Sequence, residues 1–147
     1  MPSDDTTRTA DAGMHHTGLT VSDLDESVAF YTDVLGCSVE SRFSVSGDAF
    51  ETVVEADGVS GRFVHLDGGG SRIELVEYDP ADSPRDPAAI PQPGGTHLAF
   101  AVDDVDAFVD GLPDFVDRLS EPRTTESGTR LVFVRDPDGN LVELLKA

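Results

Sequence analysis

The 147-residue sequence has little positive charge: ten basic residues, of which only Lys146 is a lysine, stand against 29 acidic ones, and the formal net charge is −19. A nucleic-acid-binding face needs cations opposite the phosphates, and an anionic membrane surface needs the same, so this composition argues against both partners. An acidic surface that is poor in lysine is typical of proteins kept soluble at high salt, where screening shortens charge repulsion. We interpret the acidity as a halophilic trait and not as a binding site.

Cysteine and long apolar runs are also scarce. The single cysteine, Cys37, excludes an internal disulfide bond, fits a reducing cytoplasm, and is interpreted as a packed thiol and not as a nucleophile. No apolar run approaches the ~18 residues of a membrane span. Residues 1–13 are polar and lack a signal-peptide core, so we expect a disordered tail there. These features predict a cytoplasmic protein without membrane contact.

An internal repeat organises the remaining chain. Residues 16–30 align with residues 97–111 at an offset of 81, with five of fifteen positions identical, and both segments begin with a histidine. Residues 62–74 and 130–143 also correspond, because each reads as strand, turn and strand with one glutamate near its end. Between the copies, residues 79–95 hold five of the nine prolines and read as a linker.

Each copy predicts the same order of elements. The first copy reads as a strand over 16–21, a helix starting at Ser22 or Asp23, a strand over 37–45, a short helix over 49–55, and a hairpin of 62–66 and 71–78. The second reads as a strand over 96–102, a helix from Asp103 that Pro113 ends early, and strands near 117–124, 129–135 and 140–146. We predict an α+β fold of two tandem βαβββ modules: a single domain over 14–147, with module one at 14–79, the proline-rich linker at 80–94 and module two at 95–147.

The histidine-bearing strands present small residues on one face. Side chains alternate along a strand, so His16 shares its face with Gly18 and Thr20 while larger residues pack under the helix. In the second copy His97 likewise shares its face with two alanines. This pattern leaves room for a cavity beside each histidine.

The last strand of each copy carries a glutamate among apolar residues. Burying Glu74 or Glu143 in such a strand is costly unless the carboxylate is paired or bound to a metal. If the two copies pack by pseudo-symmetry, these carboxylates converge with His16 and His97. Two imidazoles and two carboxylates are ligands that suit a divalent transition metal.

Other candidates receive structural interpretations. His15 competes with His16, but only His16 matches the second copy in register. His65 has no counterpart, since Phe133 stands in its place, and we interpret it as a strand-face residue and not a ligand. The turn 136–140 reads as a hairpin connection in which a glycine takes a positive φ.

Five motifs occur in one order along the chain. They are His16-x-Gly-Leu-x-Val-x-Asp-Leu, Phe30-Tyr, Arg72-Ile-Glu-Leu, Gly95-x-His-Leu-x-Phe-x-Val-x-Asp and Asp136-Pro-Asp-Gly-Asn-x-Val-Glu. In these motifs the chain resembles the vicinal oxygen chelate superfamily, which includes glyoxalase I, extradiol dioxygenases, methylmalonyl-CoA epimerase and bleomycin-resistance proteins. The resemblance implies a cup of curved mixed sheet around one metal held by His16, Glu74, His97 and Glu143. Since such cups often form between two chains, it also implies a homodimer.

The four-ligand set is similar to that of glyoxalase I. The resemblance implies one divalent ion (Ni, Zn, Co or Mn) and a small oxygenated substrate whose proton α to a carbonyl is moved through a metal-bound enediolate. Glu143 is the candidate base and Glu74 the second acid–base group. The chain has Thr20 where bacterial glyoxalase I usually has an arginine that grips glutathione, so the thiol carrier is expected to differ.

Other reactions of the same family stay open. An epimerase would use the same carboxylate pair to move a proton across one carbon. An extradiol dioxygenase would need only His16, His97 and Glu143 around ferrous iron. A non-catalytic binding protein of the resistance type would need no ligands at all, and the retained quartet argues against it.

Overall fold

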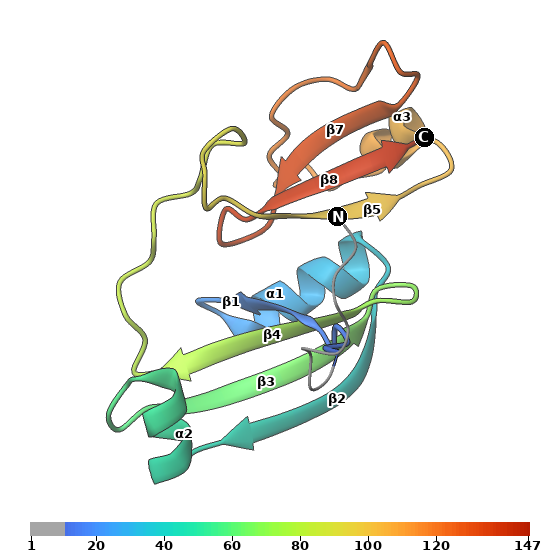
Figure 1. The fold of residues 1–147 in the computed structure, drawn as a ribbon. Helices are drawn as coiled ribbons and strands as arrows, with labels where there is room; N and C mark the ends of the chain where they lie inside the picture. Colours follow the sequence, from blue (N-terminus) through green and yellow to red (C-terminus); the bar gives the residue numbers. More distant parts are fainter. Residues whose placement is uncertain (1–10) are drawn as a thin grey trace.

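The computed structural model describes residues 11–147 and contains two four-stranded mixed sheets, one for each copy of the repeat (Figure 1). The first sheet has the order β1-β4-β3-β2 and the second the order β5-β8-β7-β6. The strands are β1 (Thr17–Thr20), β2 (Ser38–Val45), β3 (Ser60–Asp67), β4 (Arg72–Asp79), β5 (His97–Ala101), β6 (Arg123–Thr124), β7 (Arg130–Arg135) and β8 (Leu141–Lys146). The helices are α1 (Leu24–Ala29), which continues into the π-helical segment η2 (Phe30–Val34), α2 (Asp48–Val54) and α3 (Val105–Asp110). The predicted α+β fold of two βαβββ modules is confirmed.

The two crossover helices begin in the same way. Asp23 accepts a hydrogen bond from the backbone N–H of Glu26 at 3.1 Å, and Asp104 accepts one from that of Ala107 at 3.0 Å. Each aspartate satisfies an N–H group that has no partner inside its helix. The repeat therefore encodes the start of both helices. The second helix ends at Asp110, ahead of Pro113, as expected.

The prediction of a strand near residues 117–124 is mostly wrong. Only β6, two residues long, pairs with β7, and the chain before it follows β7 through single bonds such as Leu119 N–H to Phe133 O at 3.0 Å. Pro122 has no N–H to donate to a ladder, so the regular pairing cannot extend through it. The outer edge of the second sheet is consequently much shorter than β2.

A shared hydrophobic core joins the helix-bearing sides of the two sheets. It combines side chains of the first module, such as Val28 and Leu75, with side chains of the second, such as Val109 and Leu144. The linker residues 80–95 contain no helix or strand and lead from the end of β4 to β5 (Figure 1). Of the predicted tail, residues 1–10 lie outside the described residues. Among the helices within 11–147, none has the length and apolar character to cross a membrane.

A buried polar bond also links the modules. The hydroxyl of Tyr31 donates to Asp136 Oδ2 at 2.7 Å, and Asp136 Oδ1 accepts the backbone N–H groups of Asp138 and Asn140. Burial raises the pKa of Tyr31 well above its usual range, so the phenol stays protonated and donates. The turn 136–140, with Gly139 at a φ of 84°, therefore acts as the structural connection that its sequence indicates and also docks on η2.

Replacing Tyr31 with phenylalanine is expected to destabilise the protein by about 1–3 kcal/mol, because it leaves a buried carboxylate short of one donor. Urea unfolding followed by circular dichroism measures this difference. The matched control is Tyr78→Phe, which removes a hydroxyl from a half-exposed ring that water can solvate. Equal stability of the two variants would contradict the role of the Tyr31–Asp136 bond.

Candidate metal centre

Strand register aligns three polar side chains on the face of the first sheet that points away from α1. Glu74 of β4 pairs with Gly18 of β1 on one side and with His65 of β3 on the other. His16 immediately precedes β1 and lies on the Gly18 face by the alternation of the strand. The three side chains therefore lie side by side on one face of the first sheet, two of them from paired strands and His16 from the residue before β1.

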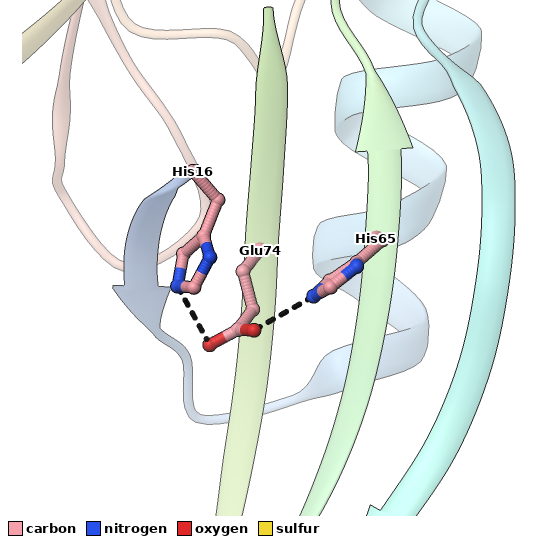
Figure 2. Close-up of side chains that lie close together, drawn as sticks. All are labelled: His16, His65 and Glu74. Atoms are coloured by element: carbon pink, nitrogen blue, oxygen red, sulfur yellow. Dashed lines mark hydrogen bonds and ion pairs between the residues drawn. The ribbon is translucent and has the colours of Figure 1, made fainter. Parts of the chain in front are cut away.

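The Glu74 carboxylate lies between two imidazoles (Figure 2). His16 Nε2 is 3.4 Å from Glu74 Oε1, and His65 Nε2 is 2.7 Å from Glu74 Oε2. The potential ligand atoms of these residues all lie within 4.8 Å of one another. Two imidazoles and a carboxylate, all partly buried, are a donor set that fits a divalent transition metal.

The second module reproduces only part of this arrangement. His97 Nε2 is 3.2 Å from Glu143 Oε1, which matches the contact of His16 with Glu74. Phe133 pairs with Glu143 as His65 pairs with Glu74, and its ring lies 5.2 Å from the His97 ring. The second module thus has a His–Glu pair with the phenyl ring of Phe133 beside it, where the first module has the imidazole of His65.

The two His–Glu pairs do not form one cluster within the chain. Over residues 11–147, the grouping of three or more metal-type donors is His16, His65 and Glu74, and neither His97 nor Glu143 belongs to it. One chain therefore presents two separate His–Glu pairs, which we call the first half-site (His16 and Glu74) and the second half-site (His97 and Glu143). The metal site that joins all four ligands stays a prediction. The sequence interpretation of His65 missed its place beside Glu74. The signal was present in the hairpin, because a turn over 68–71 pairs residue 67 with 72 and hence residue 65 with 74.

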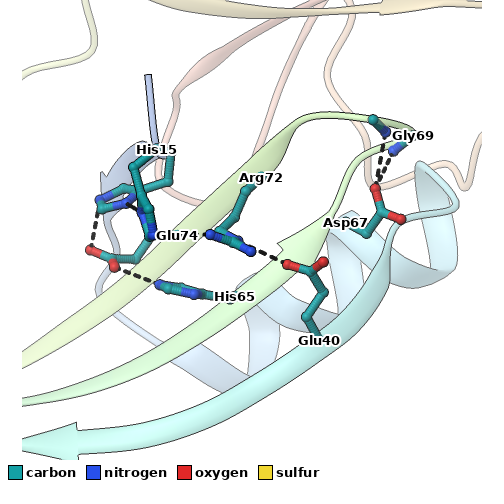
Figure 3. Close-up of polar contacts among 9 residues, drawn as sticks. His15, Glu40, His65, Asp67, Gly69, Arg72 and Glu74 are labelled. Atoms are coloured by element: carbon teal, nitrogen blue, oxygen red, sulfur yellow. Dashed lines mark hydrogen bonds and ion pairs between the residues drawn. The ribbon is translucent and has the colours of Figure 1, made fainter. Parts of the chain in front are cut away.

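His16 contacts His15, from which a chain of polar contacts runs through Arg72 to Glu40 of the edge strand β2 (Figure 3). His15 Nδ1 is 2.8 Å from His16 Nδ1, Arg72 Nη1 is 3.0 Å from His15 Nε2, and Arg72 Nε donates to Glu40 at 3.0 Å. His16, and not His15, is the imidazole that faces Glu74. The four residues of the chain of contacts, His15, His16, Glu40 and Arg72, line a pocket of about 510 Å³ at the start of β1, which does not include Glu74.

Aromatic side chains cover the same sheet face next to His65. Phe43 stacks on Phe63 with ring centroids 5.1 Å apart and meets the His65 ring edge-on at 5.0 Å. Phe50 of α2 and Tyr78 of β4 extend this aromatic wall, with ring centroids 6.2 Å apart. The candidate metal centre therefore lies beside an apolar surface, as small-molecule sites commonly do.

Comparison with known proteins gives the family. Residues 13–144 match the family model described as the Glyoxalase/Bleomycin resistance protein/Dioxygenase superfamily. This chain belongs to that superfamily. It is 32% identical to a 2-epi-5-epi-valiolone epimerase of Actinomyces sp, with 90% of this chain and 78% of the relative covered, and 32% identical to a probable lactoylglutathione lyase of Vibrio cholerae, with 89% and 88% covered.

Solved structures of superfamily members agree with the fold. A glyoxalase family protein from Bacillus cereus superposes with a TM-score of 0.82 at 24% identity, covering 95% of this chain and 96% of its own. Leishmania major glyoxalase I, described as trypanothione-dependent, superposes with a TM-score of 0.63 at 32% identity, covering 92% and 87%. Members of this superfamily generally use a divalent metal, which agrees with the donor set around Glu74.

Proposed function

We propose that this superfamily member is a divalent-metal-dependent lyase or isomerase that moves a proton α to a carbonyl of a small oxygenated substrate. The observation that supports it is the His–Glu contact, repeated at equivalent positions of both modules at 3.4 and 3.2 Å. Relatives named as an epimerase and as lactoylglutathione lyases support the same class of reaction. The bound ion would act as a Lewis acid that stabilises negative charge on the substrate oxygens.

We propose a homodimer in which the first half-site of one chain faces the second half-site of its partner. A single chain leaves both half-sites accessible: the side chains of His16 and His97 are 32% and 42% exposed. Facing half-sites would bring His16, Glu74, His97 and Glu143 to one ion. The aromatic wall of the first module would then form one side of the substrate pocket.

The two carboxylates are held differently, and this suggests their roles. Glu74 contacts two imidazoles, those of His16 and His65, and its side chain is 15% exposed. Glu143 is equally buried, but in the described part of the chain the imidazole beside it is that of His97 alone. The less restrained carboxylate can move more readily between ligand and substrate. We therefore assign Glu143 as the base that removes the proton and Glu74 as the second acid–base group.

An extradiol-type dioxygenase is the second candidate. Two histidines and one carboxylate with open positions are the ligand type of non-haem ferrous enzymes, and the cluster of His16, His65 and Glu74 has this composition. Oxygen uptake with catechols by iron-loaded protein would favour this candidate over proton transfer.

Proton exchange in D₂O tests the proposed function without knowledge of the natural substrate. The probes are the hemithioacetal of methylglyoxal with glutathione, the same adduct with a neutral thiol, and dihydroxyacetone, each followed by loss of the α-proton signal in NMR. We expect metal-dependent exchange that stops when a chelator removes the ion and returns with Ni²⁺, Zn²⁺, Co²⁺ or Mn²⁺. Protein that holds no divalent ion in elemental analysis after growth with these metals would contradict the proposal.

A further inference from the structure

We propose that His65 is a third metal-binding side chain, so that His16, His65 and Glu74 form a divalent-metal site on the first module alone. This deepens the proposed function, and rests on it only in assuming that the ion is a divalent metal. In this arrangement the first half-site loads the ion independently, and the second half-site completes its coordination.

The first argument is geometric. His65 and Glu74 lie on neighbouring strands of one sheet, His16 immediately precedes the strand on the other side of Glu74, and the potential ligand atoms of the three lie within 4.8 Å of one another. The Nε2 atoms of both histidines point at the same carboxylate, one at each oxygen (Figure 2). Two of the three donors, His65 and Glu74, are fixed on paired strands and keep their spacing better than donors on loops, which favours ion binding over chance proximity.

The second argument concerns the surroundings of the donors. The side chains of His65 and Glu74 are 14% and 15% exposed, so water solvates them poorly and a charged partner is favoured there. Phe43 meets the His65 ring edge-on at 5.0 Å and restricts its orientation. Gly18 has no side chain, and this leaves room beside Glu74 and His16. A Cβ at this position would fill that room, at 3.9 Å from Glu74 Oε1 and from His16 Cδ2.

The third argument is the difference between the modules. Phe133 occupies in β7 the register position that His65 occupies in β3, and a phenyl ring cannot bind the ion. The second module therefore offers two donors, His97 and Glu143, where the first offers three. With a third ligand in place, the first half-site is expected to keep its ion when the second pair is removed.

Nitrogen NMR of the three histidines that remain when His97 is replaced, namely His15, His16 and His65, tests the proposal directly. The sample is the full chain with His97→Ala and Glu143→Gln, and the probe is Zn²⁺ alone. On addition of one equivalent we expect Nε2 of both His16 and His65 to shift together and to carry no proton, while neither ring nitrogen of His15 takes the shift of a zinc-bound nitrogen. A His65 that merely holds Glu74 by donating a hydrogen bond would keep its Nε2 proton, and that result would overturn the proposal.

A matched substitution adds an affinity measurement. His65→Phe gives the first module the residue of the second, and in the same background we expect it to weaken Zn²⁺ binding by more than the roughly 10–100-fold seen when a residue supporting a ligand is lost. His15→Ala is the control and should change the affinity far less. Unchanged affinity in a folded His65→Phe protein would contradict the proposal, while α-proton exchange by the unsubstituted protein would still support the proposed function. Zn²⁺ bound by His16 and His65 in a protein without exchange activity would support His65 as a ligand and contradict the proposed function.

Discussion

Replacing Glu143 with glutamine is expected to slow α-proton exchange by about 10²–10⁴-fold, the range typical of losing a positioned base. The amide cannot accept the proton, yet it keeps the size of the side chain and a carbonyl oxygen near His97. In the unsubstituted protein, His97 Nε2 lies 3.2 Å from Glu143 Oε1. The three donors of the first module are untouched. We therefore expect the variant to retain its metal while its rate falls, which elemental analysis and the D₂O assay measure together.

Two comparisons make this result specific. Glu126→Gln makes the same chemical change at an exposed turn before β7 and should leave the exchange rate unaltered. Glu74→Gln removes a carboxylate that faces two imidazoles and should lower metal content as well as rate. If Glu143→Gln exchanges protons at the unsubstituted rate, then Glu143 is not the base.

Mixing two inactive variants is expected to restore about one quarter of the unsubstituted activity. One variant carries His16→Ala and Glu74→Gln, the other His97→Ala and Glu143→Gln, so each chain lacks one half-site. If the metal site forms between chains, a mixed dimer has one site with all four groups and one site with none. Random pairing makes about half of the dimers mixed, and half of their sites are complete, which gives the expected fraction.

Co-expression of the two chains, followed by the D₂O assay and a mass measurement in solution, gives the readout. As a control, either variant is co-expressed with a chain that lacks both half-sites, a combination that can form no complete site. Failure of the first pair to recover activity, in a protein that is dimeric and active when unsubstituted, would contradict a metal site shared between two chains.

Features encoded in a single element were accessible from the sequence. The sequence predicted helix starts at Ser22 or Asp23 and at Asp103, and the structure has the caps at Asp23 and Asp104; alternation along β1 and β5 separated the histidine face from the helix face. The repeat matched His16 with His97, and the structure shows equivalent contacts of each with a glutamate. Such predictions succeed because helix caps and side-chain alternation depend on residues close together in the chain.

Features that depend on several elements were not accessible in the same way. The place of His65 beside Glu74 depends on the hairpin register between β3 and β4, which the turn at 68–71 sets. The strand expected near 117–124 is reduced to the two residues of β6, which follow Pro122, because regular pairing with β7 does not extend through the proline.

The amino-acid order alone was sufficient for the two-module fold, the family resemblance and the equivalence of the histidine and the glutamate of one module with those of the other. The folded arrangement showed that each histidine contacts the glutamate of its own module, that the two pairs form no common cluster within residues 11–147, and that His65 joins the first pair through a register signalled only by the hairpin turn. The modules are placed by burial of their helix-bearing sides in a common core and by the Tyr31–Asp136 bond. The sequence shows which faces are apolar but not which of them pack against each other, because the contacting residues lie far apart along the chain and each could pack against many partners of similar size.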